Sequence, residues 1–177
     1  MSSLRSYLLG VTREYEMVLS MYRALVNIGS ACDSGEYVGV IGAALVESIL
    51  KRSRNLTRFF GIARDRRYKD VVYYLMYLRR GGAREFRRRV RACSGYEYTQ
   101  RILREVNKYV VHLVRDGVGT RGGAVKGRDG VVMVVGFLCC VFSVFTDYID
   151  VRVVGDDVVD RLRGLTVECN ELGLGLS

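Results

Sequence analysis

The stretch Gly130–Thr146, GVVMVVGFLCCVFSVFT, runs for 17 residues without a charge and lies between Asp129 and Asp147. Its content of Val and Phe would suit a strand, but its length favours a helix. Seventeen residues are at the short limit for crossing a lipid bilayer. We therefore interpret residues 130–149 as a helix buried in the core, with a membrane segment as the less favoured alternative.

Helical periodicity continues on both sides of this stretch. Seven apolar residues near the N-terminus recur at spacings of three and four, which marks one face of a helix: Leu4, Leu8, Val11, Tyr15, Val18, Tyr22 and Leu25. Similar patterns predict further helices at 36–62, 68–78, 83–93, 97–114 and 156–165. The first half of the second of these helices, 37–50, is apolar nearly all round and is expected to be buried.

Glycine is the only strong helix breaker in this chain, because proline is absent. We expect breaks at 29–33, at Gly81-Gly82 and at Ser94-Gly95, and a flexible, basic, Gly-rich loop at 116–130. With 177 residues, the chain is long enough for one domain with a real core. The prediction is an all-α fold: a single helical bundle of about six or seven helices covering 1–177.

The cysteines and the N-terminus bear on the compartment. Five cysteines are an odd number, and two of them, Cys139 and Cys140, are adjacent, so no disulfide framework is expected. No cleavable signal peptide is visible. We expect a cytoplasmic protein, or one of the virion or host cytoplasm if it is viral. Intracellular proteins of hyperthermophiles are an exception, because they can contain disulfides, and this alternative stays open. One histidine and scattered cysteines predict neither a metal site nor a cofactor.

The charge of the chain is concentrated in one block. Residues 51–128 contain 22 of the 28 Lys and Arg residues and 6 of the 19 Asp and Glu residues, which gives a net charge of +16. The segment before the block carries −2 and the segment after it −5. A basic region on an otherwise near-neutral body is typical of a protein that binds a polyanion, most often RNA or DNA.

Several groups of basic residues within this block are candidates for phosphate contacts. The predicted helix 83–93 is the most basic of these regions. A second group, Arg54 and Arg58, lies on the helix 36–62, and other basic residues lie on the helix 97–114 and in the Gly-rich loop. The candidate nucleic-acid-binding residues are Arg54, Arg58, Arg84, Arg87, Arg88, Arg89, Arg91, Arg104, Arg121, Lys126 and Arg128. Tyrosines of the block, among them Tyr74 and Tyr96, could stack on bases, although their helical spacing favours the core.

The single histidine, His112, lies in the same block. Lys108 is one turn before it and Arg115 one turn after it, so all three side chains share a helix face. Nearby cations favour the neutral imidazole, which suits a general base, and would stabilise a developing negative charge. With Asn107, these residues form a candidate site for metal-free cleavage of RNA. A histidine simply packed at a helix edge is the structural alternative.

Two motifs together resemble the HEPN superfamily: Arg54-Asn-Leu-x-x-Phe-Phe60, and Asn107-Lys-x-x-x-His112-Leu some fifty residues further on. The apolar run near residue 140 is similar to the terminal helix of a prokaryotic branch. The resemblance covers about residues 47–115. It implies a dimeric helical bundle that acts as a metal-independent ribonuclease of a defence or toxin–antitoxin system, with an antitoxin or other protein as a further partner. At the position of the family's catalytic arginine this chain has Asn107.

Two other classes of function suit parts of the sequence. A non-enzymatic nucleic-acid-coating protein, similar to a viral nucleocapsid, would need the basic helix and loop but no histidine. A helical protein-interaction bundle of the viral Bcl-2-like kind would suit the central apolar helix, but it gives no reason for the +16 block.

Overall fold

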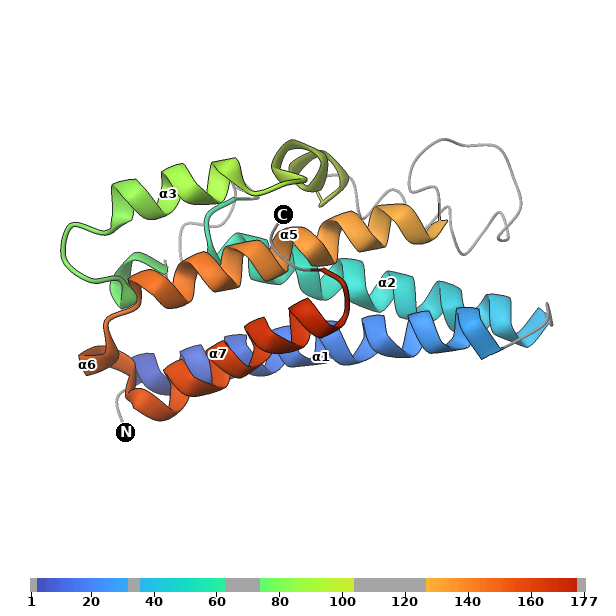
Figure 1. The fold of residues 1–177 in the computed structure, drawn as a ribbon, viewed down its shortest axis with the longest axis horizontal. Coiled ribbons are helices and arrows are strands. Elements are labelled where there is room, and N and C mark those ends of the chain that lie inside the picture. The colour runs from blue at the N-terminus through green and yellow to red at the C-terminus, as the bar shows by residue number, and fades with distance from the viewer. Residues whose placement is uncertain (1–2, 32–35, 63–73, 104–126, 175–177) are drawn as a thin grey trace.

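The computed structural model describes residues 3–31, 36–62, 74–103 and 127–174. Within these ranges the chain is a helical bundle without strands, which confirms the all-α prediction (Figure 1). Residues 96–103 are helical too. The named elements are α1 (Ser3–Ala31), α2 (Glu36–Phe59), the 3₁₀ turn η1 (Tyr74–Tyr77), α3 (Ala83–Ala92), α5 (Gly127–Tyr148), α6 (Val151–Val154) and α7 (Asp156–Glu171).

The helix α5 lies at the centre of the bundle. It runs between α3 on one side and α7 on the other, and it also packs against α1 and α2, which form a long antiparallel pair (Figure 1). Seven of its side chains are fully buried: Val131, Val134, Val135, Leu138, Val141, Phe142 and Phe145. The prediction of a buried helix is therefore confirmed. The segment Asp129–Tyr148 is also long and apolar enough to cross a membrane, with 61% of its apolar window buried in the bundle.

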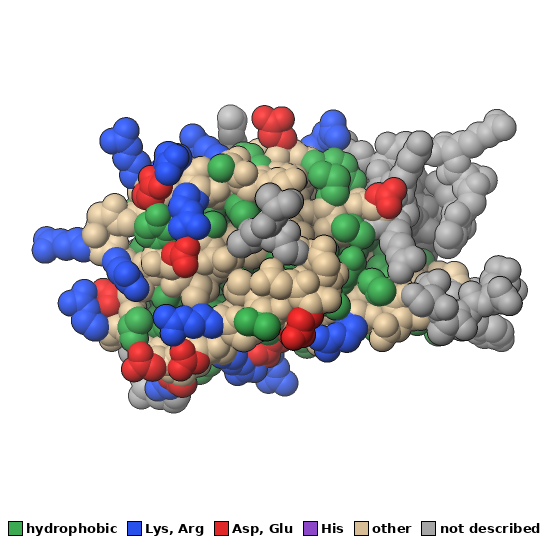
Figure 2. All heavy atoms as spheres, viewed as in Figure 1, with side chains coloured by type: hydrophobic (Ala, Val, Ile, Leu, Met, Phe, Trp, Pro, Cys, Tyr) green, Lys and Arg blue, Asp and Glu red, His purple; other side chains and the backbone are tan. Residues whose placement is uncertain are grey.

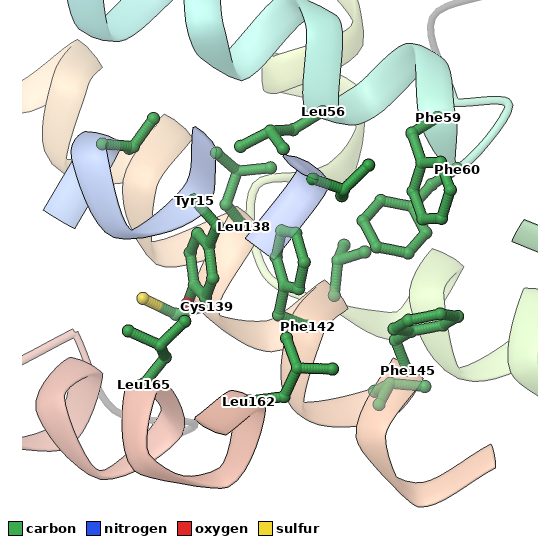
Figure 3. Packing of buried hydrophobic residues seen from close by; sticks show 14 of the residues in the cluster. Tyr15, Leu56, Phe59, Phe60, Leu138, Cys139, Phe142, Phe145, Leu162 and Leu165 are labelled. Atoms are coloured by element: carbon green, nitrogen blue, oxygen red, sulfur yellow. The ribbon is translucent and has the colours of Figure 1, made fainter. Parts of the chain in front are cut away.

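Aromatic side chains from α1, α5 and the end of α2 pack together in the core (Figure 3). Tyr15 of α1 stacks on Phe142 of α5, with 3.9 Å between the ring centroids and 5° between the planes. Phe60, just after α2, meets the edge of Phe142 at 5.0 Å and contacts Phe86 of α3 at 6.0 Å. Burying each such ring stabilises the fold by about 1.5–3 kcal/mol relative to exposing it. This cluster fixes α3 and the end of α2 against the central helix.

The end of α2 turns sharply away at a glycine. Gly61 has a φ of +65°, the left-handed region that favours glycine. Its amide donates to the carbonyl of Arg58, and the amide of Ile62 donates to that of Thr57, both at 2.9 Å. This is the Schellman pattern that ends a helix. The helix therefore ends at Phe59, three residues before the predicted end. The turn that follows places Phe60 in the core.

Three predictions about the elements differ from the described structure, and one short helix was missed. Of the predicted helix 68–78 the described residues, 74–78, form only η1, because the backbone then pairs with the end of α5 and the residues after it: Arg79 N donates to Tyr148 O at 2.9 Å and Asp150 N to Tyr77 O at 2.7 Å. The end of the predicted loop 116–130 is helical, since α5 begins at Gly127. α7 continues past 165 to Glu171, and α6 had not been predicted.

The first half of α2 also differs from its prediction. Val40 is 65% exposed and Ile41 50%, whereas burial begins only at Ile49 and Leu50. The apolar pattern alone could not show this. Burial depends on which helices reach this part of α2, and these two side chains are not covered by any described element.

Two disulfides contradict the expectation that the cysteines stay unpaired. Cys93 pairs with Cys140, and Cys139 pairs with Cys169. Neighbouring residues on a helix point about 100° apart. The adjacent cysteines of α5 therefore reach different neighbours, one at the end of α3 and the other on α7. An odd number of cysteines excludes only a structure in which all five are paired. The fifth cysteine, Cys32, lies outside the described residues.

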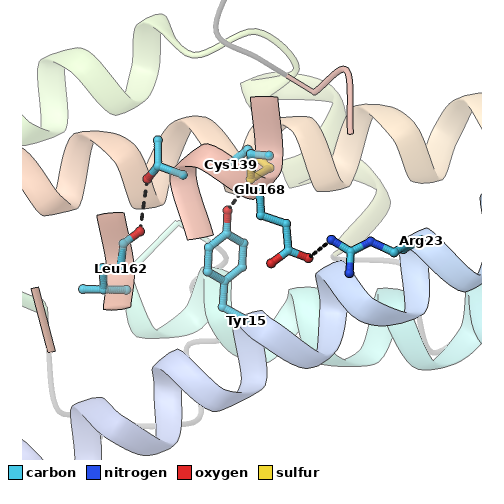
Figure 4. The surroundings of a disulfide bond; sticks show 7 residues. Tyr15, Arg23, Cys139, Leu162 and Glu168 are labelled. Carbon is cyan, nitrogen blue, oxygen red and sulfur yellow. Dashed lines mark hydrogen bonds and ion pairs between the residues drawn. A yellow bond between two sulfur atoms is a disulfide. The ribbon is translucent and has the colours of Figure 1, made fainter. Parts of the chain in front are cut away.

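The disulfide between α5 and α7 lies beside a buried tyrosine (Figure 4). The Tyr15 hydroxyl is 2.8 Å from the sulfur of Cys169, and it is the donor because a disulfide sulfur carries no hydrogen. Burial, with a smaller contribution from the Glu168 carboxylate, raises the pKa of Tyr15 well above its usual value. Glu168 in turn pairs with Arg23 of α1 at 2.8 Å. This contact region joins α1, α5 and α7.

Candidate nucleic-acid interface

The helix α3 presents an apolar face to the core and a basic face to solvent. Phe86 and Val90, one turn apart, are buried against the aromatic cluster. The exposed arginines follow the spacing i, i+3, i+4, i+7, which places them on one face of the helix: Arg84, Arg87, Arg88 and Arg91. We call these four residues the arginine face. In Figure 2, Lys and Arg side chains gather at the end of the molecule where α3 lies.

The five arginines of α3 differ in their partners. Arg88 pairs with Glu85 on the same helix, with its Nε at 2.8 Å from the carboxylate. That hydrogen bond is the main reason why the pKa of Glu85 is lowered. Arg89 points the other way: it pairs with Asp147 of α5 at 2.7 Å and lies over the Tyr148 ring at 5.7 Å. Arg89, predicted to bind nucleic acid, therefore joins α3 to α5.

Arg87 and Arg91 face a hollow of about 370 Å³ beside α3. The Arg87 Nε donates to the hydroxyl of the buried Tyr74 at 2.8 Å. Arg91 has no carboxylate partner within the part of the chain that the structure describes, and the same holds for Arg84. These guanidinium groups therefore remain available to an external anion.

The other candidate residues lie elsewhere or beyond the described ranges. Arg54 and Arg58 are half-buried and one turn apart on the last part of α2. Arg128 belongs to the first turn of α5. The remaining candidates, including the whole predicted catalytic set, lie outside the described residues: Arg104, Asn107, Lys108, His112, Arg115, Arg121 and Lys126.

Several residues of this region gave only a weak signal in the sequence. Tyr74 and Tyr96 line the hollow. In the sequence, only the presence of tyrosines among the arginines of the basic block pointed to these two residues. Gln100 gave no signal at all. It donates to the carbonyl of Ile62 at 3.1 Å and to the Tyr96 hydroxyl at 3.0 Å, and so fixes residues 96–103 to the segment after α2. Nothing in its neighbours along the sequence could have predicted these contacts.

Comparison with protein-family models, with curated proteins and with solved structures finds no match for this chain. The resemblance to the HEPN superfamily therefore stays a prediction. In the described ranges, no group of three or more His, Cys, Asp or Glu side chains is placed to hold a metal ion. What the described residues offer chemically is a set of exposed guanidinium groups beside a partly aromatic hollow.

Proposed function

We propose that this protein binds nucleic acid, and that the arginine face of α3 makes the main phosphate contacts. The observation that carries this proposal is the position of the four arginines on one exposed face, with a single acidic residue, Glu85, on the same helix. Arginine side chains contact phosphate oxygens with two parallel hydrogen bonds. The net charge of +9 and a pI near 9.5 would also draw a polyanion toward the molecule.

The rest of the fold supports this role of α3. Phe86 and Val90 fix the helix in the core, and Arg89 pairs with Asp147, so the arginine face is presented on a rigid element. A preorganised face loses less conformational entropy on binding than a flexible tail does. RNA and DNA are both within the proposal, because phosphate contacts do not distinguish them.

The proposal is tested by a variant in which Arg84, Arg87, Arg88 and Arg91 are all replaced by alanine. The matched control replaces four exposed arginines outside the basic block: Arg13, Arg23, Arg152 and Arg163. Both variants lose the same charge, so general attraction falls equally. Fluorescence anisotropy with a labelled oligonucleotide should show a large loss of affinity in the first variant only. Equal losses in both would contradict a specific role of α3.

A further inference from the structure

The hollow beside α3 is built from four separate segments of the chain. They are the residues just after α2, η1, α3 and the start of 96–103, and the hollow measures about 370 Å³. Pockets for small ligands have volumes of about 300–1,000 Å³. Its wall contains four aromatic residues and two arginines, and no Asp or Glu among the described residues that line it: Phe60, Tyr74, Phe86, Arg87, Arg91 and Tyr96.

Arg87 is oriented toward this hollow by a buried partner. Tyr74 is 4% exposed and accepts a hydrogen bond from the Arg87 Nε at 2.8 Å. That bond uses one of the five N–H groups of the guanidinium and leaves those of both terminal nitrogens for a ligand. Arg91 lies one helical turn further on. The next two arginines after Arg87 each have a carboxylate partner, Glu85 for Arg88 and Asp147 for Arg89.

The chemistry of the wall indicates the kind of ligand. The two cations suit a phosphate, which a planar guanidinium binds through paired hydrogen bonds. Phe60, Tyr74 and Phe86 are at most 4% exposed, so the half-buried Tyr96 is the ring that a flat group could contact beside the two cations. The Tyr96 hydroxyl, which accepts from Gln100 Nε2 at 3.0 Å, still has its own hydrogen to donate. A ligand that combines a phosphate with a flat ring, as a nucleotide does, would fit both features.

We propose that the hollow receives one unpaired nucleotide of single-stranded RNA or DNA, with its phosphate on Arg87 and Arg91. This inference rests on the proposed function and adds the class of substrate. A base inside a duplex is paired and stacked, so it cannot enter a hollow of this kind, whereas an unpaired base can. The arginine face would then hold the backbone on both sides of the inserted nucleotide, and the protein would prefer single strands to duplexes.

The test uses two variants that keep the charge of the chain: Arg87→Lys with Arg91→Lys, and as the control Arg152→Lys with Arg163→Lys, two exposed arginines outside the basic block. Lysine retains the positive charge but loses the planar, two-pronged geometry of the guanidinium. Anisotropy is measured with a short oligonucleotide as a single strand and as a duplex. We expect the first variant to bind the single strand about tenfold more weakly, as the loss of charge-assisted hydrogen bonds implies. Its duplex affinity should fall by clearly less, because only the single strand can place a base in the hollow, and both affinities of the control should change little.

Competition against the labelled single strand separates a nucleotide site from a simple anion site. A nucleoside monophosphate should displace the oligonucleotide from the unaltered protein at lower concentration than inorganic phosphate does. Equal displacement by the two would overturn the inference, as would equal effects of the two lysine variants. In either case salt-dependent binding by the unaltered protein would leave the proposed function standing. No binding of any nucleic acid at low salt would overturn both.

Discussion

At the scale of single residues, identical side chains on α3 have different roles. The sequence presents five arginines within eight positions, and spacing alone distinguishes them only by helix face. The structure separates Arg89, which pairs with Asp147, from Arg87, which is oriented by Tyr74. These partners lie 58 and 13 residues away along the chain. The basic character of the helix was therefore predictable from sequence, but the role of each arginine was not.

The role of His112 remains a prediction at this scale. If the protein cleaves RNA, we expect His112→Ala to abolish cleavage while folding and binding are retained. Histidine is the only side chain whose unperturbed pKa lies near neutrality, and His112 is the only histidine of the chain. General-base catalysis contributes about 10²–10⁴-fold to rate. The check is a time course with labelled RNA, with EDTA present and with analysis of the products.

The expected product of that reaction carries a 2′,3′-cyclic phosphate, because the base would activate the adjacent 2′-hydroxyl. Cleavage that persists in His112→Ala, or that stops when metal is chelated, would contradict this mechanism. Binding by the unaltered protein without any cleavage would instead favour the nucleic-acid-coating alternative, and would fit the presence of Asn107 where the HEPN signature has an arginine.

At the scale of elements, apolar periodicity predicted the long helices well and their limits less well. The face of α1 that carries Leu8, Tyr15 and Tyr22 is buried as expected. Periodicity missed the features that depend on contacts between elements. The extra turns of α7 bury Cys169 against α5, and η1 ends where the backbone pairs with the residues after α5. Both depend on how the helices are placed in space.

The two disulfides should differ in how readily a small thiol reduces them. Cys93–Cys140 lines a second hollow, of about 440 Å³ between α3 and α5, and Cys140 is half-buried. Cys139 and Cys169 are each only 2% exposed. An attacking thiolate needs access to a sulfur atom. We therefore expect Cys93–Cys140 to open first under native conditions, as timed alkylation and peptide mass mapping would show.

The order of reduction has a simple control. In a denaturant both bonds are exposed, so the difference in rate should largely disappear. Each disulfide closes a long loop, with sequence separations of 47 and 30 residues, and loop entropy alone assigns each about 4 kcal/mol of stability. Equal native rates for the two bonds would contradict the account, because they would mean that reduction proceeds through unfolding of the whole bundle.

At the scale of the whole molecule, the fold distributes the charges unevenly. Arginines of α1 and α7 are largely paired with carboxylates between the same two helices: Arg5 with Asp157 at 2.6 Å, Arg23 with Glu168 at 2.8 Å, and Arg161 with Glu16 at 2.6 Å. Exposed pairs of this kind contribute little to stability. They do neutralise that side of the bundle, whereas α3 on the other side of α5 keeps most of its arginines available.

The sequence alone was sufficient for this overall picture only in part. The all-α bundle around the run at 130–146 follows from periodicity, whereas the polyanion partner inferred from the basic block stays a prediction. The hollow beside α3 could not be predicted, because its walls come from four segments between residues 60 and 96 that no local pattern relates. Its formation depends on Gly61, which ends α2, and on the buried rings that hold α3 in place.

Binding of nucleic acid through the exposed arginines can be measured as the affinity of the unaltered protein for a single-stranded oligonucleotide over a range of salt concentrations. Each phosphate contact releases counterions, so the logarithm of the association constant should fall linearly with the logarithm of salt concentration. The slope should be about −0.7 for each phosphate contacted. With four arginines on the face of α3, we expect a total slope near −3. An affinity that does not change with salt, or no binding at low salt, would contradict the account.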